Sequence, residues 1–408
     1  MVKGWTKKRL GEMFDISGGL SVSRAQLSDN GHPYLHYGDI HGSQKTFIEL
    51  CEDSAIPRLD VPLNKVSRVS LLQNGDIVFV DASEDDEGAS RHIVVRNAKN
   101  LPFISGLHTI VAKARTNELE NLYREFCFQT AAVKSQFKFY AVGTKVVGVN
   151  KKSIKDIVVE FPTDKAEQRA ISTALSDTDA YIASLEEVIA KKRAIKQGTM
   201  QALLTGKRRL ALFSGQGEWA EKKLGDTGEI IIGGTPPTAV GEYWNGDILW
   251  VTPTDITDKK DIQAVERKIS EAGLAKIREL PPDTLLVTCV ASIGKNAVLR
   301  TKGASNQQIN AIVPFEDYDV DFLYYLVEIN RPLLESKAGI TATKIVSKTE
   351  FSEIELRFPP TKTEQLAISG ILSDMDSELD VLTEKLTKAR RIKQGMMSEL
   401  LTGRIRLV

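Results

Sequence analysis

Two glycine-bearing stretches of the sequence resemble loops that bind cofactors, but neither completes its motif. Residues 213–217, FSGQG, fit the F-x-G-x-G pattern of loops that hold S-adenosylmethionine, yet no N-P-P-F/Y or D-P-P-Y motif accompanies them. Residues 292–296, SIGKN, resemble the end of a phosphate-binding loop, but Cys289 stands where the first glycine belongs and Asn296 replaces the final Ser or Thr. We therefore interpret the first stretch as a linker and expect no nucleotide at the second.

The acidic and histidine residues also form no catalytic or metal-binding pattern. Residues 81–91, DASEDDEGASR, could bind a hard cation, but they lack EF-hand spacing and a second acidic cluster, so a solvated loop is the better interpretation. All five histidines lie in the first half of the chain: His32, His36, His41, His92 and His108. Because no Ser-His-Asp or Cys-His pattern stands out, we expect no catalytic residue, metal or cofactor in this chain. A histidine or two at a binding face stays possible.

The composition is that of a soluble protein with more than one domain. A chain of 408 residues exceeds one ordinary hydrophobic core, and its 26% charged residues are usual for globular proteins. No apolar run approaches the ~18–20 residues of a membrane span, and the N-terminus lacks the apolar core of a signal peptide. Cys51, Cys127 and Cys289 form no CxxC pair, so we expect buried free thiols and a cytoplasmic location. Lys+Arg and Asp+Glu both total 54, which argues against a protein that coats nucleic acid non-specifically.

The strongest signal is an internal repeat. Residues 161–210 align without a gap to residues 358–407, and more than half of the positions are identical, including IKQG and LLTG. Both copies read as long helices that begin at capping-box patterns, Asp164-x-x-Glu167 and Thr361-x-x-Glu364, and end at Gly206 and Gly403. Each copy closes with basic residues, KRR or RIR, which either favour the helix dipole or bind a partner.

Each repeated helix carries a heptad seam over about three repeats, which predicts a coiled coil. Its pairing residues are Ile171, Leu175, Ile182, Leu185 and Ile189 in the first copy, and Ile368, Leu372, Leu379, Leu382 and Leu386 in the second. Roughly 40 helical residues make a rod of about 60 Å, and two rods separated by whole domains can pair antiparallel. Gly198 and Gly395 occupy the same place in the two helices, and we expect them to let the backbones approach closely or bend.

Fainter matches precede each helix and complete the fold prediction. Residues 5–19 resemble 219–234, YGDI resembles PTDI, and NGDIVFVDAS resembles PPDTLLVTCVAS. We expect an α+β protein in which two mixed α/β globes are joined by two long helices that form an antiparallel coiled coil, with a pseudo-two-fold internal repeat. The expected boundaries are residues 1–160 for the first globe, 161–213 for the first helical spacer, 214–357 for the second globe and 358–408 for the second helical spacer.

Two divergent globes, each followed by a nearly identical helix with EQ-x-AIS and IKQG…LLTG, resemble the specificity subunit of type I DNA restriction–modification systems. The resemblance covers the whole chain. It implies that each globe is a target-recognition domain that reads one half of a bipartite double-stranded DNA target, and that the helices set the unread spacer. It further implies docking of two methyltransferase (modification) subunits, which carry S-adenosylmethionine, and of two restriction subunits. The chain itself would be non-catalytic.

The resemblance also points to loops that could contact DNA. The candidate residues are Arg24, Tyr37, His41, Arg91, Thr144, Lys145, Thr252, Thr254, Ser292, Lys295, Thr343 and Lys344, with Ser21, Ser83 and Thr235 beside them. The TK pairs at Thr144-Lys145 and Thr343-Lys344 occur in both globes and are the best of these candidates. Two alternatives stay open: a specificity subunit of a methyltransferase-only system, and a coiled-coil scaffold that binds only protein.

Overall fold

The computed structural model describes residues 2–43, 45–50, 56–83, 91–143, 147–337 and 345–407. The chain divides into two compact units. The first contains residues 1–185 and 385–408, and the second contains residues 186–384. Each unit therefore holds one globe together with part of each long helix, so the helical spacers do not form bodies separate from the globes.

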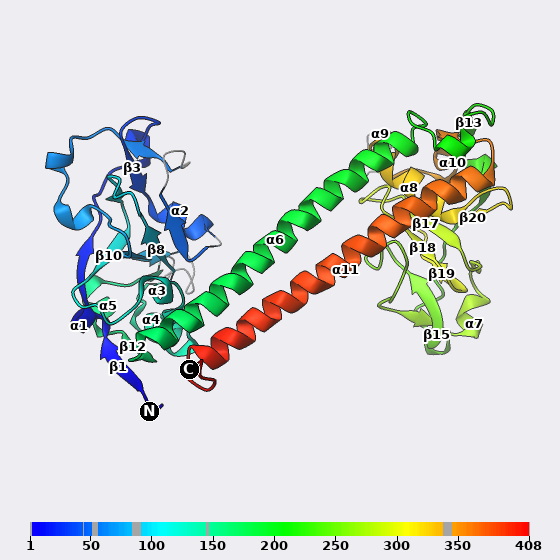
Figure 1. The fold of residues 1–408 in the computed structure, drawn as a ribbon. Helices are drawn as coiled ribbons and strands as arrows, with labels where there is room; N and C mark the ends of the chain where they lie inside the picture. The colour runs from blue at the N-terminus through cyan, green and yellow to red at the C-terminus, as the bar shows by residue number, and fades with distance from the viewer. Residues whose placement is uncertain are drawn as a thin grey trace. The chain divides into compact units, whose positions relative to one another are not determined.

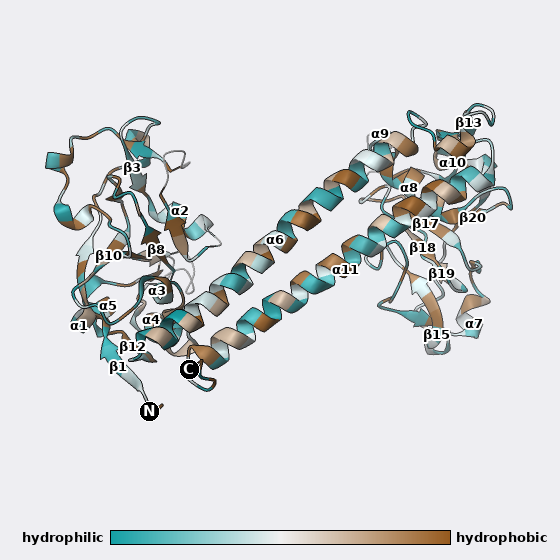
Figure 2. Cartoon of the chain, in the orientation of Figure 1, coloured by the Kyte–Doolittle hydropathy of each residue, from teal (hydrophilic) through white to brown (hydrophobic). Residues whose placement is uncertain are grey.

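Two long helices carry the repeat, α6 (Lys165–Leu203) and α11 (Lys362–Leu400), each of 39 residues. Side chains of the two helices meet in both units, and residue numbers rise along one helix as they fall along the other. The contacts are Thr178 with Met396 and Asp179 with Lys393 in the first unit, and Lys192 with Glu378 and Lys196 with Asp376 in the second. The helices are thus antiparallel in each unit. Apolar and polar residues alternate along both of them (Figure 2).

The predicted seam residues are buried to different degrees. Ile171, Leu175, Ile368 and Leu372 are at most 2% exposed and belong to the cores of the globes as well as to the helix pair. Leu185 and Ile189 are also buried, whereas Ile182, Leu379, Leu382 and Leu386 are half-buried. The seam residues are therefore most deeply buried where a globe covers them.

The interpretation of Gly198 and Gly395 as points of close backbone approach is wrong. Both glycines are exposed, and a Cβ atom built on either would meet no heavy atom of the described chain within 4 Å. The helices continue through them without interruption. Nothing inside the described chain explains why a residue of low helix propensity stands twice at this position.

The repeated glycines at the helix ends do have a structural role. Gly206 and Gly403 adopt left-handed φ values of +69° and +70°, as expected of residues that end a helix. A Cβ on Gly206 would lie 3.2 Å from the ring of Trp219, and a Cβ on Gly403 would lie 2.9 Å from the ring of Trp5. Each glycine therefore both turns the chain and makes room for the tryptophan that opens a globe.

The first globe is built around a five-stranded sheet of order β2-β10-β6-β8-β4, with pairs β1-β12 and β7-β11 and a small sheet β5-β3-β9. The strands are β1 (Trp5–Arg9), β2 (Phe14–Gly18), β3 (His32–Leu35), β4 (Phe47–Glu49), β5 (Arg58–Leu59), β6 (Ile77–Val80), β7 (Ala82–Ser83), β8 (His92–Arg96), β9 (Ile104–Ser105), β10 (Thr109–Ala114), β11 (Val147–Gly148) and β12 (Val158–Pro162). The helices are α1 (Leu10–Met13), α2 (Tyr37–Gly42), α3 (Asn121–Cys127), α4 (Ala131–Tyr140) and α5 (Lys151–Asp156).

Alternation along the strands buries both faces of this sheet. Ile77 and Phe79 pack with Tyr123 and Phe126 of α3, whereas Val78 and Val80 face a second core that contains Ile40 of α2. The buried free thiol predicted at Cys127 is confirmed, because burial raises its pKa and it forms no disulfide. Cys51 lies outside the described residues.

The second globe repeats this plan with a four-stranded sheet of order β14-β20-β17-β18, a three-stranded sheet β16-β15-β19 and the pair β13-β21. Its strands are β13 (Ala220–Lys223), β14 (Gly228–Ile232), β15 (Trp244–Val251), β16 (Lys268–Ile269), β17 (Thr284–Thr288), β18 (Asn296–Leu299), β19 (Gly303–Ser305), β20 (Ile309–Pro314) and β21 (Glu355–Phe358). Its helices are α7 (Glu271–Leu274), α8 (Val320–Ile329), α9 (Arg331–Ser336) and α10 (Lys348–Ser352). Cys289 is a buried free thiol, as predicted, and burial raises its pKa to about 11.

A repeated Glu-Gln pair, the EQ pair (Glu167-Gln168 and Glu364-Gln365), stands in the first turn of each long helix, and its glutamate links the two helices at their ends. Glu364, at the start of α11, accepts two hydrogen bonds from Arg209, which follows α6, at 2.9 and 2.6 Å. Glu167, at the start of α6, is held in the same way by Arg406, which follows α11. Both carboxylates are fully buried. The expected capping-box role of these glutamates is therefore replaced by ion pairs between residues far apart in the sequence.

The glutamine of the EQ pair holds each globe against its helix. Gln168 accepts a hydrogen bond from the backbone N–H of Glu120 at 2.8 Å and donates to the carbonyl of Glu118 at 2.8 Å. Gln365 makes the matching contacts with Asp319 at 3.0 Å and Asp317 at 3.2 Å. These bonds fix the start of α3 in the first unit and of α8 in the second. Glu120 and Asp319 are thus equivalent N-cap positions.

Candidate nucleic-acid interface

One edge of the first globe gathers most of the candidate DNA-binding residues. Strands β2, β3, β6 and β9 end at this edge and β8 and β10 begin there, as their pairing registers show. The loops that leave the strands are joined by backbone hydrogen bonds, from Gly106 N to Leu35 O at 2.8 Å and from Asp81 N to His108 O at 3.2 Å. Residues widely spaced in the sequence are thereby held in one surface.

An aromatic cluster occupies the middle of this edge. The ring centroid of Tyr37 lies 4.4 Å from that of His36, 6.0 Å from that of His41 and 5.3 Å from that of His108. His108 Nδ1 is 3.1 Å from a carboxylate oxygen of Asp81, which holds the ring in place. The YGDI stretch that carries Tyr37 and His41 is a short helix, α2, rather than the loop expected from the sequence. It forms because His36 Nδ1 accepts a hydrogen bond from Gly38 N at 3.1 Å.

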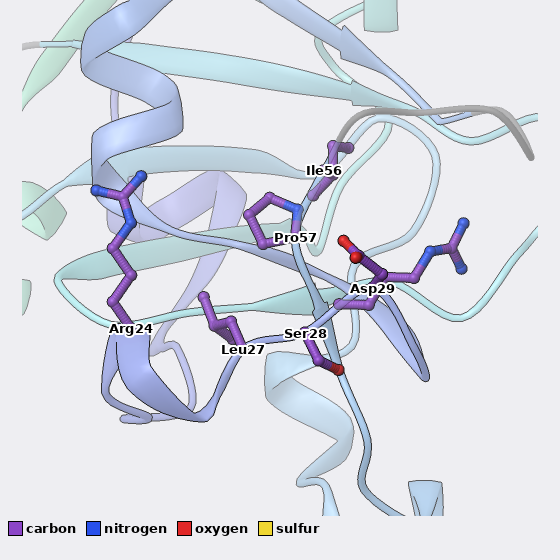
Figure 3. A pocket seen from close by; sticks show the side chains of 7 residues that line it. Arg24, Leu27, Ser28, Asp29, Ile56 and Pro57 are labelled. Atoms are coloured by element: carbon purple, nitrogen blue, oxygen red, sulfur yellow. The ribbon is translucent and has the colours of Figure 1, made fainter.

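Two arginines flank the cluster. Arg91 donates a hydrogen bond to the carbonyl of His41. Arg24 is exposed and lines a hollow beside β5 together with Leu27, Ser28, Asp29, Ile56, Pro57 and Arg58 (Figure 3). Burial lowers the pKa of His36, with positive charge from Arg24 and His108 adding to the shift and Asp39 opposing it. The edge therefore combines tyrosine and imidazole rings with arginine side chains.

The second globe presents the same edge with different side chains. Strands β14 and β17 end there and β18 and β20 begin there, according to their registers. Backbone bonds from Gly234 N to Ser305 O at 2.8 Å and from Asn306 N to Val251 O at 2.9 Å join its loops. Thr235 donates a hydrogen bond to Gln307 at 2.8 Å across the edge. Neutral hydroxyl and amide groups take the place of the histidine cluster.

The remaining candidates of the second globe lie on this edge too. The hydroxyl groups of Thr252 and Thr254 are 2.8 Å apart, and Thr252 also donates to Asp255 at 2.7 Å. The turn with Ser292 and Lys295 folds back on the end of β17, where its backbone bonds Thr288. The structure thus brings the described candidate residues of each globe to one surface.

The TK pairs cannot be placed in this way. Thr144, Lys145, Thr343 and Lys344 lie outside the described residues, as do residues 84–90 of the acidic stretch. Described neighbours reach the edge in both globes: Val147 pairs with Ser83, and Ile345 bridges Val290. The role of the TK pairs stays a prediction.

Sequence reasoning did not nominate Gln307, Gln308 or His108 for the edge. Their signal is a short match between the globes, SGLHT at 105–109 and SNQQI at 305–309, each between two strands. Cys289 N bonds Gln308 O as Asp81 N bonds His108 O, so Gln308 and His108 are equivalent. His108 also has a left-handed φ of 55°, as does Ala291 of the second edge at 62°. Such strained conformations concentrate at functional sites.

Among the described residues, no group of three or more His, Cys, Asp and Glu side chains is placed to hold a metal ion. The same part of the chain contains no helix with the length and hydropathy to span a membrane. The two edges contain polar, aromatic and cationic side chains, beside the carboxylates of Asp81 and Asp255. Such side chains suit recognition of base edges and phosphates.

Comparison with known proteins finds a match in each half of the repeat. A family model described as type I restriction modification DNA specificity domain matches residues 2–197 and 216–391, one match in each half of the repeat. The MjaIX specificity subunit of Methanocaldococcus jannaschii is 32% identical over 190 residues, which are 45% of this chain and 43% of that protein. The putative MjaX specificity subunit of the same organism is 21% identical over 413 residues, covering 93% of this chain and 91% of the relative.

Solved structures share the fold. The S subunit of a type I restriction–modification system from M. genitalium superposes with a TM-score of 0.60 at 15% identity, covering 97% of this chain and 96% of that one. The alignment with the MjaIX subunit spans less than half the length of either protein, but the family model covers most of the chain in two copies. The chain belongs to the family of type I restriction modification DNA specificity domains.

Proposed function

We propose that this chain is the DNA sequence-recognition subunit of a type I restriction–modification complex. Each globe reads one half of a bipartite target through its strand-end edge. The observation that carries the proposal is that equivalent loops build an edge in both halves of the repeat, with a Tyr-His cluster in one and Thr and Gln side chains in the other. Different side chains on the same frame are what two different half-sites require.

The two long helices connect the globes and leave the DNA between the half-sites unread. Half-sites read from one side of a duplex have centres about one helical turn, ~34 Å, apart. The chain itself is non-catalytic, and S-adenosylmethionine binds in the partner methyltransferase subunits.

Two methyltransferase subunits dock on the helices, and two restriction subunits join through them. A repeated and unexplained surface supports this part of the proposal. Ile195 and Gly198 are exposed on α6, and Ile392 and Gly395 are exposed at the equivalent positions of α11. An exposed isoleucine beside a glycine with open space around it suits the close approach of a partner helix.

The docking surface is tested with alanine at the repeated glycines. Gly198→Ala and Gly395→Ala should each preserve folding, because alanine favours helix by roughly 1 kcal/mol and finds open space. Each change should weaken binding of one methyltransferase subunit in titrations followed by analytical ultracentrifugation. Gly370→Ala is the matched control, because Gly370 is equally exposed but has no counterpart in α6. Unchanged assembly of both variants would remove these glycines from the docking surface.

DNA recognition is tested by sequencing methylated adenines in cells that express the chain with its methyltransferase. The proposal predicts one bipartite motif with a fixed spacer. Tyr37→Ala should relax one half of this motif and Gln307→Ala the other, with a loss of about 1–3 kcal/mol for each base contact removed. A methyltransferase-only system would give the same motif without cleavage, and a protein scaffold would give no motif at all.

A further inference from the structure

The second globe carries a group of basic side chains around a short strand and a short helix. Arg267, Lys268, Lys276 and Arg278 surround β16 and α7 and are all exposed. None of them forms an ion pair with a carboxylate among the described residues, in contrast to Lys302 nearby, whose Nζ is 2.8 Å from Glu271. Four unpaired cations in one surface repel one another unless an anion binds there.

Aromatic rings hold two of these cations in place. The guanidinium of Arg267 lies 3.6 Å from the ring centroid of Trp244 and 5.5 Å from that of Trp250. The ammonium of Lys276 lies 5.7 Å from the ring centroid of Tyr243. A guanidinium stacked on a ring keeps its N–H groups free at the edge, and its orientation is set before a ligand arrives.

Each pair of these residues stands next to a loop of the candidate reading edge. Glu266 N donates a hydrogen bond to Asp255 at 2.8 Å, so Arg267 and Lys268 follow directly beside the Thr252–Thr254 turn. A Cβ on Gly234 would lie 3.0 Å from Ile277, so Lys276 and Arg278 stand beside the loop that carries Thr235. Two cations therefore lie beside each of these two loops.

Residues 266–279 contain four basic side chains and three carboxylates. Lys302 donates a hydrogen bond to Glu271 at 2.8 Å, and this bond raises the pKa of Lys302, with the charge of Glu279 adding to the shift. Glu266 is the remaining carboxylate in the segment from 266 to 279. The local charge of the segment is positive although the whole chain is neutral.

We propose that Arg267, Lys268, Lys276 and Arg278 bind DNA phosphates beside the bases read by the second globe. The proposal rests on the proposed function and adds the backbone contacts that hold the reading edge in register. Phosphate contacts position a protein on the duplex without reading its sequence, and each contact releases counterions. The surface should therefore govern the affinity and salt dependence of binding but not the choice of bases.

The test compares two double variants of the full-length chain assembled with its methyltransferase. Lys276→Gln with Arg278→Gln removes two proposed phosphate contacts without touching the Trp244 stack. Lys222→Gln with Lys223→Gln is the control, because these residues precede the start of β14, at the opposite end of that strand from the edge. They bond Tyr318 and Glu353 within the globe, so the melting temperature of the control is compared with that of the parent. Binding is measured between 50 and 200 mM salt on the target duplex and on a duplex altered in the second half-site.

For the first double variant, the slope of log K against log salt should become shallower by roughly 1.8, at about 0.9 for each phosphate contact. The ratio of affinities for the target and the altered duplex should stay at the parental value, and the control variant should keep the parental slope. An unchanged slope, or a changed ratio, overturns the inference while the proposed function stands. A parent protein that binds both duplexes equally overturns the proposed function and this inference with it.

Discussion

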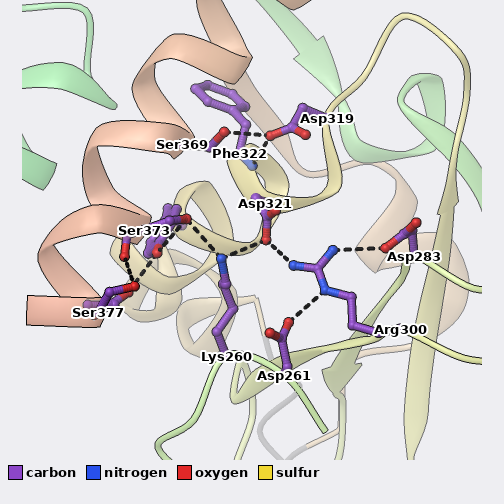
Figure 4. Close-up of polar contacts among 12 residues, drawn as sticks. Lys260, Asp261, Asp283, Arg300, Asp319, Asp321, Phe322, Ser369, Ser373 and Ser377 are labelled. Carbon is purple, nitrogen blue, oxygen red and sulfur yellow. Dashed lines mark hydrogen bonds and ion pairs between the residues drawn. The ribbon is translucent and has the colours of Figure 1, made fainter. Parts of the chain in front are cut away.

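The two globes make the same contacts with the first turn of their helices but different contacts further along the helices. In both units the EQ pair holds the start of the helix, with the glutamate bound to an arginine and the glutamine bound to the globe. Beyond this point the second globe follows α11 for several more turns, through Ser369 with Asp319, Ser373 with Lys260, Asp376 with Tyr325 and Asp380 with Lys259. Figure 4 shows part of this network, which continues through Asp321 to Arg300.

Among the described residues, the first globe has no such later contacts at the equivalent positions. Ser176 aligns with Ser373, but its buried hydroxyl has no hydrogen-bond partner in the described chain. Phe126 aligns with Tyr325 and offers no hydroxyl to Asp179, the counterpart of Asp376. The repeated helix residues therefore determine the contacts at the first turn, which both globes share. The sequence of each globe determines how far its contacts continue along the helix.

The largest expected effect comes from the shared part of the attachment. Leu175 and Leu372 are equivalent and both are 0% exposed. Leu175→Ala and Leu372→Ala should each lower the free energy of unfolding by about 2–5 kcal/mol, because each leaves a cavity in a packed core. Calorimetry of the full chain should show equal losses, each in a different unit. Leu366→Ala is the control, because Leu366 is 49% exposed. A large difference between the two leucines would show that the shared attachment is not equivalent.

The glutamines should give a smaller and unequal effect. Gln168→Ala removes three hydrogen bonds, including one to Pro162 O at 2.8 Å, and leaves buried groups without partners at a cost of about 1–3 kcal/mol. Gln365→Ala should cost less, because the second globe keeps its later contacts with α11. Hydrogen exchange at the start of α3 and α8 measures this directly. Faster exchange at α8 than at α3 would contradict the order.

These two attachments also mark what the sequence could and could not predict. The long helices, their antiparallel pairing, the two mixed globes and the strand-end loops follow from periodicity and repetition, which are local signals. The partner of Glu167 is Arg406, and nothing near Glu167 in the sequence indicates it. The glycines Gly198 and Gly395 were misread because a glycine in a helix shows only that space or freedom is needed, not on which side.

A third test exchanges one atom between the globes. Tyr325→Phe gives the second globe the residue of the first and removes the hydroxyl that donates to Asp376 at 2.6 Å. We expect a loss of about 1 kcal/mol, confined to the second unit. Phe126→Tyr is the reciprocal variant, and it should gain nothing, because Asp179 is already paired with Lys393. Equal melting of parent and Tyr325→Phe would mean that the later contacts add no stability.

The smallest expected effect separates the two reading edges by pH. His36 caps α2, and burial holds its pKa below the ordinary value of about 6.5. The aligned residue of the second globe, Thr252, does not titrate. As the pH falls through about 6.5, the unfolded chain binds a proton at His36 more readily than the folded chain does. His36 therefore lowers the stability of the first unit in acid. It has no effect well above about pH 6.5. His36→Asn keeps an acceptor for Gly38 N. In this variant the free energy of unfolding, measured by denaturation between pH 7.5 and 5.5, should fall less steeply with decreasing pH than in the parent. The other four histidines are present in both proteins, so the difference between parent and variant isolates His36. A variant with the parental pH slope would show that His36 is not held neutral by the fold.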